Sequence, residues 1–421
     1  MDICFKELVL SESSSVALAV TPAQRRLSRP AAFGAVAAVI VLFLAASSAP
    51  SPLYVVYQQQ WHFSATTLTA VFAVYVLGLL ASLLVLGRLS DHLGRRPVLA
   101  AAIALEAGSL VLFLVAGNVT VLYLARLLQG IATGAAITTL GAALVDLTPP
   151  HAPGRAGVVN GVSPTAGLAL GALGCGVLVQ YGPAPTHLVY ALLLAILVAA
   201  AVAVAVLPET SARRPGAGAA LVPRLAVPEH ARPGFFALIP IMIAGWSLGG
   251  LYLSLGPSVA AGVFGLSNHL IGGLVVTALC GTGAITTFAL RNRAAGLALR
   301  TGATMLTAGM AVTLAGIISD SVVLAIVGTV GAGVGFGASA LAMFGSLAQL
   351  ARPTERGALF AVGYLVAYLA FSVPAVIAGF ATTAAGLRPT AIAYGAMIIV
   401  LALAALLSHA RQVRGKESAA V

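Results

Sequence analysis

Long apolar runs set the strongest constraint on how this chain can fold. Only 8% of its 421 residues are Asp, Glu, Lys or Arg, whereas a soluble protein carries about 25%. A helix that crosses the hydrocarbon core of a bilayer needs about 20 predominantly apolar residues. The sequence contains twelve such runs. It therefore predicts an all-α membrane protein with twelve transmembrane helices.

The expected spans contain several glycines and prolines, which membrane helices tolerate because neighbouring groups satisfy the freed backbone. Their positions, to within a few residues, are 31–57, 66–86, 97–116, 119–144, 157–180, 186–207, 235–259, 268–290, 301–319, 321–350, 357–383 and 389–409.

Basic residues alternate from one connection to the next. Twenty of the 22 Lys and Arg residues fall in the two tails and in every second connection, and these are Lys6, Arg25, Arg26, Arg29, Arg88, Arg95, Arg96, Arg155, Arg213, Arg214, Arg224, Arg232, Arg291, Arg293, Arg300, Arg352, Arg356, Arg411, Arg414 and Lys416. The other connections hold only Arg388, and Arg126 lies inside a span. Cytoplasmic loops are rich in Lys and Arg. We therefore expect the protein to lie in the cytoplasmic membrane, with both termini in the cytoplasm.

This one-sided pattern also accounts for the net charge of +11, so we expect no nucleic-acid partner. The three cysteines, Cys4, Cys175 and Cys280, are too widely spaced for a metal cluster or a disulfide framework, and no cofactor or metal is expected. The N-terminal sequence RRLSRPAAFGAVAAV resembles a twin-arginine export signal. We favour a first membrane helix that stays attached, because eleven more spans follow and none needs a cleaved leader.

A faint internal repeat divides the chain. Three pairs of residues occupy corresponding positions in the two halves, and these are Pro52 and Pro257, Gly130 and Gly335, and Pro164 and Pro374. Both halves would have the same orientation, which is the parallel repeat of one transporter class. We expect cytoplasmic tails at 1–30 and 411–421, six-helix bundles at 31–207 and 235–410, and a central cytoplasmic loop at 208–234.

The connection between the second and third spans reads GRLSDHLGRR from Gly87 to Arg96. It resembles the G-x-L-x-D-R-x-G-R-K/R signature of the major facilitator superfamily, and it lies where that family has it. His92 replaces the Arg that usually follows the Asp. The resemblance extends over nearly the whole chain, and it implies two pseudo-symmetric six-helix bundles that act as a secondary transporter, which we expect to be a monomer in the lipid bilayer.

The resemblance also implies a conformational latch formed by Gly87, Asp91, Gly94, Arg95 and Arg96. Asp91 would meet the N-terminus of the span 357–383, which favours an anion, and would hold the outward-facing state. Arg95 is expected to pair with Asp146. The alternative is that these basic residues only fix topology.

The span 119–144 places Arg126, Gln129, Gly130 and Thr133 on one helical face. This resembles the R-x-x-Q-G-x-x-x-G pattern of the same family. An Arg deep in a span costs about 2.5–3.5 kcal/mol on insertion scales, so it should face a cavity or a partner. Glu106 lies at a similar depth and is the obvious partner. It is expected to be either a proton carrier or half of a structural ion pair.

The span 157–180 partly resembles the glycine-rich signature of the drug–proton antiporters in this family. Gly161, Pro164 and Gly167 match, whereas Ser163 and Leu168 replace two of its glycines. Helix packing explains these small residues as well as antiport does. The junction Leu207–Thr210, which reads LPET, is common to several branches and does not discriminate between them.

Side chains with rings or polar groups on the first, seventh and eleventh spans outline a candidate substrate cavity. It consists of Tyr54, Gln58, Trp246, Tyr364 and Tyr368. The leading hypothesis is proton-coupled efflux of small apolar or amphipathic compounds. The alternatives are proton-linked import of a sugar or organic acid and a membrane sensor that transports nothing. The sequence shows no nucleotide-binding motif or soluble catalytic domain, so we do not expect an enzyme.

Overall fold

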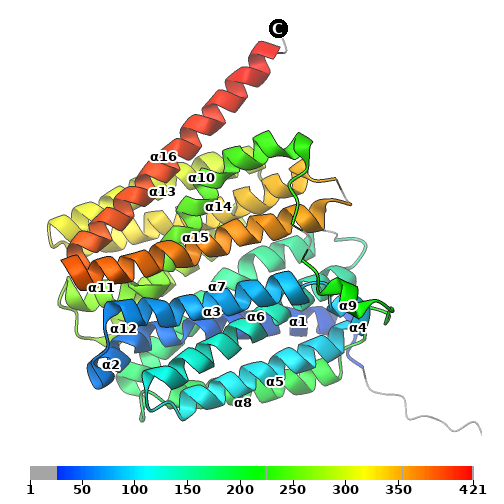
Figure 1. Cartoon of the computed structure of the whole chain (residues 1–421), viewed down its shortest axis with the longest axis horizontal. Coiled ribbons are helices and arrows are strands. Elements are labelled where there is room, and N and C mark those ends of the chain that lie inside the picture. The colour runs from blue at the N-terminus through cyan, green and yellow to red at the C-terminus, as the bar shows by residue number, and fades with distance from the viewer. Residues whose placement is uncertain (1–25, 153, 224, 353, 420–421) are drawn as a thin grey trace, which may run out of the picture.

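The computed structural model of the chain describes residues 26–419 apart from 153, 224 and 353, and all regular elements in that part are helical (Figure 1). The helices are α1 (Arg29–Ser48), α2 (Pro50–Trp61), α3 (Ala65–Leu86), α4 (Ser90–Leu93), α5 (Arg95–Leu114), α6 (Val119–Leu147), α7 (Arg155–Tyr181), α8 (Leu188–Ala205), α9 (Ala217–Ala220), the 3-10 turn η1 (Glu229–Ala231), α10 (Arg232–Ser254), α11 (Gly256–Gly262), α12 (His269–Leu290), α13 (Ala295–Ile318), α14 (Val322–Leu350), α15 (Arg356–Ala385) and α16 (Leu387–Ala419). Residues up to 25 lie outside the described part of the chain, and Cys4, Lys6 and Arg25 are among them. Arg224 lies outside it too.

Twelve of these segments are long and apolar enough to cross a membrane, which confirms the predicted number of spans. The first span consists of α1 and α2, runs from Arg29 to Trp61 and is longer than expected, since it ends only where His62 adopts a positive φ of 51°. The ninth span begins at Ala295 rather than at 301, because the helix includes the charged Arg300 in its first turns.

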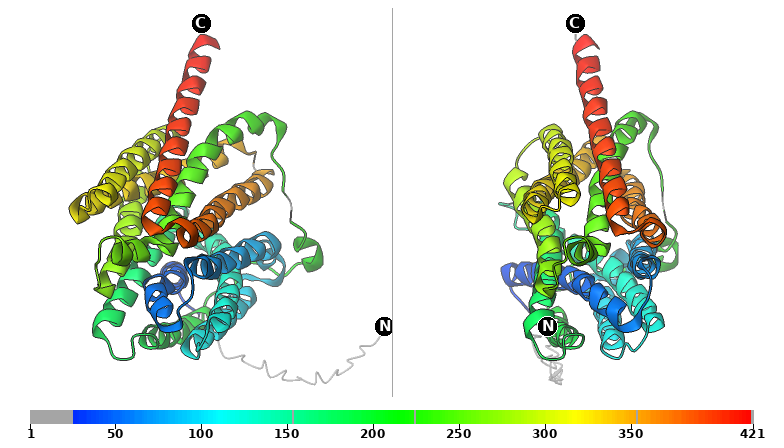
Figure 2. Two further views of the ribbon diagram at one scale, coloured as in Figure 1. Left: turned by 60° about the vertical axis from the view of Figure 1, so that its left-hand side comes forward. Right: turned by 90° about the vertical axis from the view of Figure 1, so that its left-hand side faces the viewer.

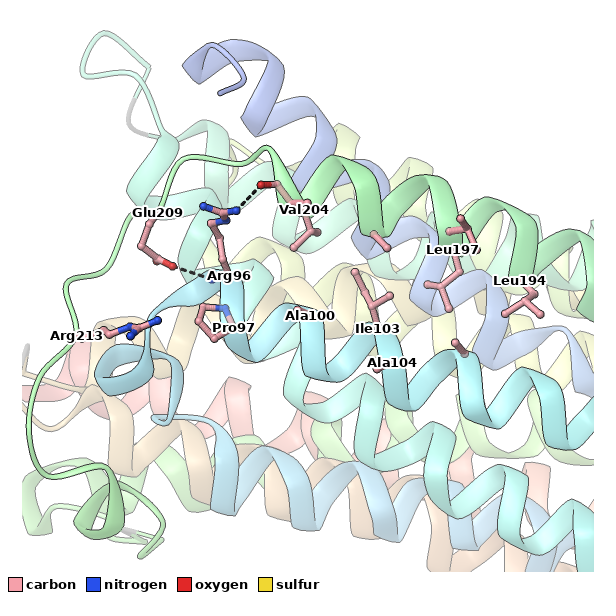
Figure 3. A pocket seen from close by; sticks show the side chains of 14 residues that line it. Arg96, Pro97, Ala100, Ile103, Ala104, Leu194, Leu197, Val204, Glu209 and Arg213 are labelled. Atoms are coloured by element: carbon pink, nitrogen blue, oxygen red, sulfur yellow. Dashed lines mark hydrogen bonds between the residues drawn. The ribbon is translucent and has the colours of Figure 1, made fainter. Parts of the chain in front are cut away.

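The helices form two bundles, and we call α1–α8 the N half and α10–α16 the C half. In the N half, α6 packs against α3 and α5, and α1 packs against α7. In the C half, α14 packs against α12 and α13, and α10 against α15 and α16. Figures 1 and 2 show the N half in the lower part of each view and the C half above it. The helices α5 and α8 lie side by side at the outer side of the N half (Figure 3).

The first span of each half is interrupted by proline. The helix α1 gives way to α2 at Ala49, directly before Pro50, and α10 gives way to α11 at Leu255, two residues before Pro257. Proline lacks the N–H group that would bond the carbonyl four residues earlier. The two halves thus carry the same interruption at corresponding places, as expected for an internal repeat.

One end of the bundles gathers the described chain ends and the long central connection, and we call it the termini face. There the Leu27 N–H donates to the Val206 carbonyl at 3.0 Å, and the Arg214 N–H donates to the His92 carbonyl at 2.9 Å. The Ser408 hydroxyl, near the end of the last span, donates to the Ala237 carbonyl in the first turns of α10. The basic residues of the alternating connections therefore gather at this face, whereas Arg388 lies at the opposite end, which we call the far face.

The two halves are joined mainly through α7 with α12 and α3 with α15. The Thr66 hydroxyl hydrogen-bonds Thr383 at 2.9 Å, and the Gln180 side chain accepts from the His269 N–H at 2.9 Å. A third bond runs from the Thr277 hydroxyl to the Ala169 carbonyl at 3.0 Å. Among the described residues, no ion pair joins the two halves.

The α7–α12 contact depends on a close approach at Gly273. A Cβ added there would lie 2.4 Å from the Ala172 carbonyl oxygen and 3.2 Å from the Gly176 Cα. We expect Gly273→Ala to lower the midpoint of thermal unfolding of the purified protein in detergent, since overpacking costs about 1–3 kcal/mol. Gly174→Ala on α7 is the matched control, because a Cβ there meets nothing within 4 Å. Equal midpoints for both variants would contradict a tight contact.

Candidate functional site

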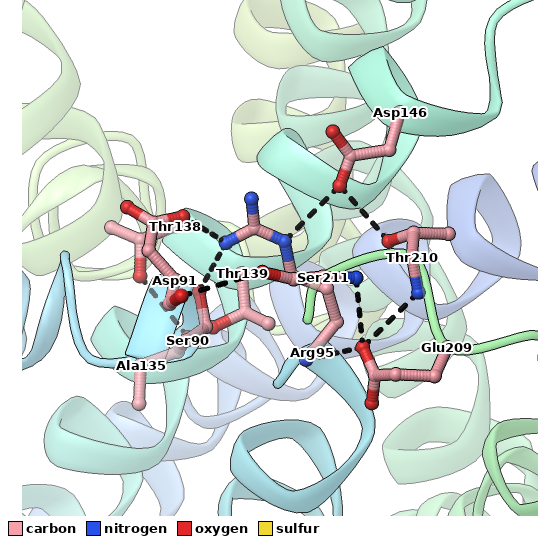
Figure 4. Close-up of polar contacts among 10 residues, drawn as sticks. All are labelled: Ser90, Asp91, Arg95, Ala135, Thr138, Thr139, Asp146, Glu209, Thr210 and Ser211. Atoms are coloured by element: carbon pink, nitrogen blue, oxygen red, sulfur yellow. Dashed lines mark hydrogen bonds and ion pairs between the residues drawn. The ribbon is translucent and has the colours of Figure 1, made fainter. Parts of the chain in front are cut away.

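The loop between α3 and α5 holds a cluster of charges at the termini face. The Arg95 guanidinium donates from Nη1 to Asp91 Oδ1 at 2.5 Å and from Nε to Asp146 Oδ2 at 3.2 Å (Figure 4). Nη1 also donates to the Ser90 hydroxyl at 2.7 Å. The Arg95 side chain is 11% exposed, whereas that of Asp91 is 51% exposed. Arg95 therefore connects the loop, through Asp146, to the end of α6.

A carboxylate from the distant junction LPET completes this cluster. Glu209 accepts hydrogen bonds from the backbone N–H groups of Arg95 at 2.8 Å and Arg96 at 3.1 Å, which are the first residues of α5. It also accepts from the N–H groups of Thr210 and Ser211, both at 3.1 Å. A carboxylate at a helix N-terminus satisfies free N–H groups and is stabilised by the helix dipole. Glu209 therefore fixes the start of α5 to the segment after α8.

Gly94 makes this arrangement possible. It has a φ of +97°, and a Cβ added there would lie 2.9 Å from Glu209 Oε2. A residue with a side chain would be strained by the backbone and would also displace the carboxylate. The structure thus gives the second glycine of the loop signature a specific role in admitting Glu209, which sequence reasoning missed.

We expect Glu209→Ala to lower the free energy of unfolding by about 0.5–2 kcal/mol, because the N-terminus of α5 loses its capping acceptor. Thermal unfolding of the purified protein measures this change. Glu229→Ala is the matched control, since Glu229 is 89% exposed and, among the described residues, its only ion pair is with Arg232 nearby in sequence. A similar small effect for both variants would argue against the capping role.

The expected contact between Asp91 and the N-terminus of α15 is not formed in this conformation, where the Asp91 carboxylate bonds Arg95 instead. Glu355 occupies the N-cap position of α15, and its carboxylate lies 3.6 Å from His230 Nε2. Gly357 in the first turn of α15 has open space around it. The structure therefore brings Arg95, Asp91 and Asp146 together but does not place Asp91 at α15.

A second polar cluster is buried inside the N half, around Arg126. Its Nη1 donates to the Ser47 carbonyl at 2.9 Å and to Gln129 Oε1 at 2.7 Å, and its Nε donates to the Tyr54 hydroxyl at 2.7 Å. The guanidinium also lies over the Tyr75 ring, 4.9 Å from the centroid. Arg126 is 1% exposed, so these acceptors and the ring replace water around its charge.

Gln129 connects Arg126 to Glu106. Its Nε2 donates to Glu106 Oε1 at 3.1 Å and to the Ala46 carbonyl at 3.1 Å, while its Oε1 accepts from Arg126. Ala46 lies four residues before Pro50, so its carbonyl has no helical donor to bond. The proline interruption of the first span thus supplies an acceptor to this cluster.

The expected direct pairing of Glu106 with Arg126 is absent from the structure. Similar depth in the membrane brings the two residues into one cluster, but the Gln129 amide lies between them. Glu106 is 0% exposed, and its Oε2 has no hydrogen-bond partner among the described residues. Glu106 and Arg126 are therefore connected by two hydrogen bonds through the Gln129 amide and do not form the ion pair.

The predicted cavity residues separate into different environments. Trp246, Tyr368 and Tyr364 form a row of rings in the C half, which we call the aromatic stack. Trp246 meets Tyr368 edge to face at a centroid distance of 4.9 Å, and Tyr368 stacks on Tyr364 at 6.2 Å. Trp246 also meets Phe371, which contacts Phe72 of the N half at 5.2 Å. This aromatic stack therefore reaches from α15 to the contact between the halves.

The other two cavity residues lie elsewhere. Tyr54 is 1% exposed and belongs to the Arg126 cluster. Gln58 lies near the far face, where its side chain donates to the Phe63 carbonyl at 3.4 Å.

The small residues of α7 pack against both halves. A Cβ added at Gly167 would lie 2.6 Å from the Val41 carbonyl oxygen of α1, and one at Gly161 would lie 3.2 Å from the Thr287 methyl group of α12. Pro164 lies inside α7 between them. The helix thus contacts α1 within the N half and α12 across the junction.

The solved structures that share this fold include two transporters. The human organic anion transporter MFSD10 (TETRAN) superposes with a TM-score of 0.63 at 17% identity, covering 90% of this chain and 100% of that one. A bacterial homologue of the human lysosomal transporter Spinster, in an inward-facing and unoccupied conformation, superposes with a TM-score of 0.68 at 15% identity, covering 90% and 97%. A comparison with curated proteins returned no match.

The profile of the Major Facilitator Superfamily matches residues 36–315, which is well over half of the chain. The chain therefore belongs to the Major Facilitator Superfamily and is a membrane transporter. Its two helical bundles have the fold that this resemblance implied.

Proposed function

We propose that the protein exports small apolar or amphipathic compounds across the cytoplasmic membrane in exchange for protons, by alternating access. Both termini would lie in the cytoplasm, since the termini face carries the arginines that favour that side. The bundles 31–207 and 235–410 would rock against each other, with 208–234 as the central cytoplasmic loop and 1–30 and 411–421 as cytoplasmic tails.

The observation that carries the proton coupling is the incompletely bonded carboxyl of Glu106. Intramembrane acids are costly and commonly belong to proton pathways. A proton on the free Oε2 would leave the bond from Gln129 to Oε1 in place. Loss of that proton would create a negative charge one amide away from Arg126. The change in charge would then reach α1 and α2, because Gln129 and Arg126 bond the Ala46 and Ser47 carbonyls and Tyr54.

The aromatic stack supports apolar or amphipathic cargo. Trp246, Tyr364 and Tyr368 are all partly exposed, and the spans from α10 to α15 contain no Asp or Glu within their helices. Rings with a polar edge bind flat apolar surfaces and still offer hydroxyl or indole hydrogen bonds. A dedicated site for a polycation would need acidic groups there, so we assign uncharged or weakly polar compounds.

The decisive experiment uses everted membrane vesicles with an imposed pH gradient and a panel of apolar and amphipathic compounds. Antiport predicts that transported compounds dissipate the gradient and accumulate in the vesicles. Uptake of sugars or organic acids by intact cells, with a gradient that the panel leaves unchanged, would instead establish import. Vesicles that lack the protein provide the baseline.

We expect Glu106→Gln to abolish gradient-driven transport while substrate binding is kept, because the amide preserves the acceptor for Gln129 but cannot release a proton. Glu229→Gln is the control, since that carboxylate is exposed near the central connection. Substrate binding is measured by equilibrium titration of the purified variants. Unchanged gradient coupling in Glu106→Gln would remove Glu106 as the proton carrier.

We further propose that Gly87, Asp91, Gly94, Arg95, Arg96 and Asp146 act as a latch when the termini-face ends of the two halves come together. Asp91 is half exposed and could then exchange its bond to Arg95 for the N-terminus of α15. Its carboxylate would favour the outward-facing state, in which it meets the N-terminus of α15, over the conformation in which it bonds Arg95.

We expect Asp91→Asn to insert and fold normally but to transport about five- to thirtyfold more slowly, as a loss of 1–2 kcal/mol for one state implies. Asp320→Asn at the far face is the control. Hydrogen bonds from Arg388 lower the pKa of the Asp320 carboxyl, so that residue is a charged partner in a pair of the same kind. Full transport by Asp91→Asn would exclude the latch.

A further inference from the structure

A groove on the outer side of the N half runs between α5 and α8 from the termini face toward the middle of the helices. Its volume is about 720 Å³, which is within the range of about 300–1,000 Å³ for ligand pockets. Pro97, Ala100, Ala104 and Val198 along it are exposed, so the groove opens outward from the bundle, on the side that would face lipid. Of the residues that line the groove, only Arg96 also belongs to the proposed latch.

The walls of the groove are apolar and shaped by small residues. On α5, Ala100, Ala104 and Ala107 are one helical turn apart and form a shallow floor. Leu194 and Leu197 of α8 are among the larger side chains on the facing wall. From Arg96 to Ala107 the floor extends about 16 Å at 1.5 Å per residue, which is about half of a 30 Å hydrocarbon core. Its length therefore matches one leaflet.

Charged side chains line only one end of the groove, at the termini face. Figure 3 shows Arg96, Glu209 and Arg213 together there, with the apolar side chains leading away from them. The carboxylate of Glu209 accepts from four backbone N–H groups at the start of α5 and in its own segment, so its oxygens already have hydrogen-bond donors while its negative charge remains. Two arginines and one carboxylate leave this end of the groove with a net charge of +1, and the guanidinium groups are its donors for a ligand.

Arg96 is held by a side-chain contact and Arg213 by the backbone around it, and both keep donors free. Arg96 Nη2 donates to the Ala205 carbonyl at the end of α8, which aims the guanidinium across the groove mouth. The backbone on either side of Arg213 is tied to the preceding loop, because the Arg214 N–H bonds the His92 carbonyl and the Ser211 hydroxyl bonds the Asp91 carbonyl. Among the described residues, the Arg213 side chain has no hydrogen bond or ion pair.

We propose that this groove binds an anionic phospholipid, with its phosphate between Arg96 and Arg213 and one acyl chain along α5 and α8. Arginine recognises phosphate through paired hydrogen bonds, and basic pockets between membrane helices bind anionic headgroups. The apolar floor of the groove is as long as one leaflet and suits the acyl chain, and the two arginines at its mouth suit the phosphate. Bound there, the lipid would join the end of α8 to α5, the helix that carries both Arg95 and Glu106.

The first experiment compares ligands on the purified, delipidated full chain by thermal unfolding. We expect phosphatidylglycerol to raise the unfolding midpoint in a saturable way. Phosphatidylcholine with the same acyl chains and soluble glycerol phosphate should have little effect. An equal effect of phosphatidylcholine would overturn the role of charge, and competition by glycerol phosphate at equal concentration would overturn the need for an acyl chain.

The second experiment compares variants in the same titration. Arg96→Gln/Arg213→Gln should weaken phosphatidylglycerol binding at least tenfold, whereas Arg291→Gln/Arg293→Gln, with the same loss of charge at the termini face of the C half, should not. Arg213→Gln alone tests the site without removing the contact of Arg96 to α8. Equal weakening by both double variants would show diffuse attraction and overturn the proposal.

The acyl-chain part has its own pair of variants. Ala104→Trp places a large side chain on the floor of the groove and should weaken phosphatidylglycerol binding without changing any charge. Ala101→Trp is the matched control, because Ala101 is exposed on the same helix but does not line the groove. Undiminished binding in Ala104→Trp would place the lipid elsewhere.

Discussion

A guanidinium buried among membrane helices must find acceptors for its N–H groups, and this requirement organises the interior of the N half. Arg126 obtains them from a backbone carbonyl, a phenol and an amide on three different helices. The Tyr75 ring on a fourth helix covers the guanidinium. Because a charge left without these partners in a low-dielectric interior would be very costly, the relative positions of α1, α2, α3 and α6 are constrained together.

The interruption of the first span contributes directly to this arrangement. Pro50 removes one backbone bond from the helix, and the Ala46 carbonyl that loses its donor receives one from Gln129. Gln129 can then present its carbonyl to Arg126 and its N–H to Glu106. The C half has the same interruption before Pro257, yet Gly331 rather than an arginine stands in the corresponding part of α14. The two halves therefore share a backbone design but differ in interior chemistry, with a buried guanidinium and carboxyl group in the N half and contacting aromatic rings in the C half.

The amino-acid sequence was sufficient to predict the spans and the polar face of α6, because apolar length and helical periodicity are local properties. It was not sufficient to identify the bridge at Gln129. Estimated depth in the membrane gives the height of Glu106 and Arg126 but not the direction in which each side chain points. Pro50 was a usable signal, since a proline within a span marks a free carbonyl four residues earlier. Glu209 had no comparable signal, because its contact with α5 depends on the path of the chain after α8.

The hydrogen bonds of Glu209 and the neighbouring residues also limit how far the two halves can separate. The segment after α8 is fixed to the N half through Ser211, Arg214 and Pro215, and α9 contacts α4. Only the stretch from Leu221 to Pro228 then leads to η1 and α10. Fully extended, these residues span about 28 Å at about 3.5 Å each. The connection is thus a short tether with a fixed anchor, and it sets an upper bound on the width of any opening at the termini face.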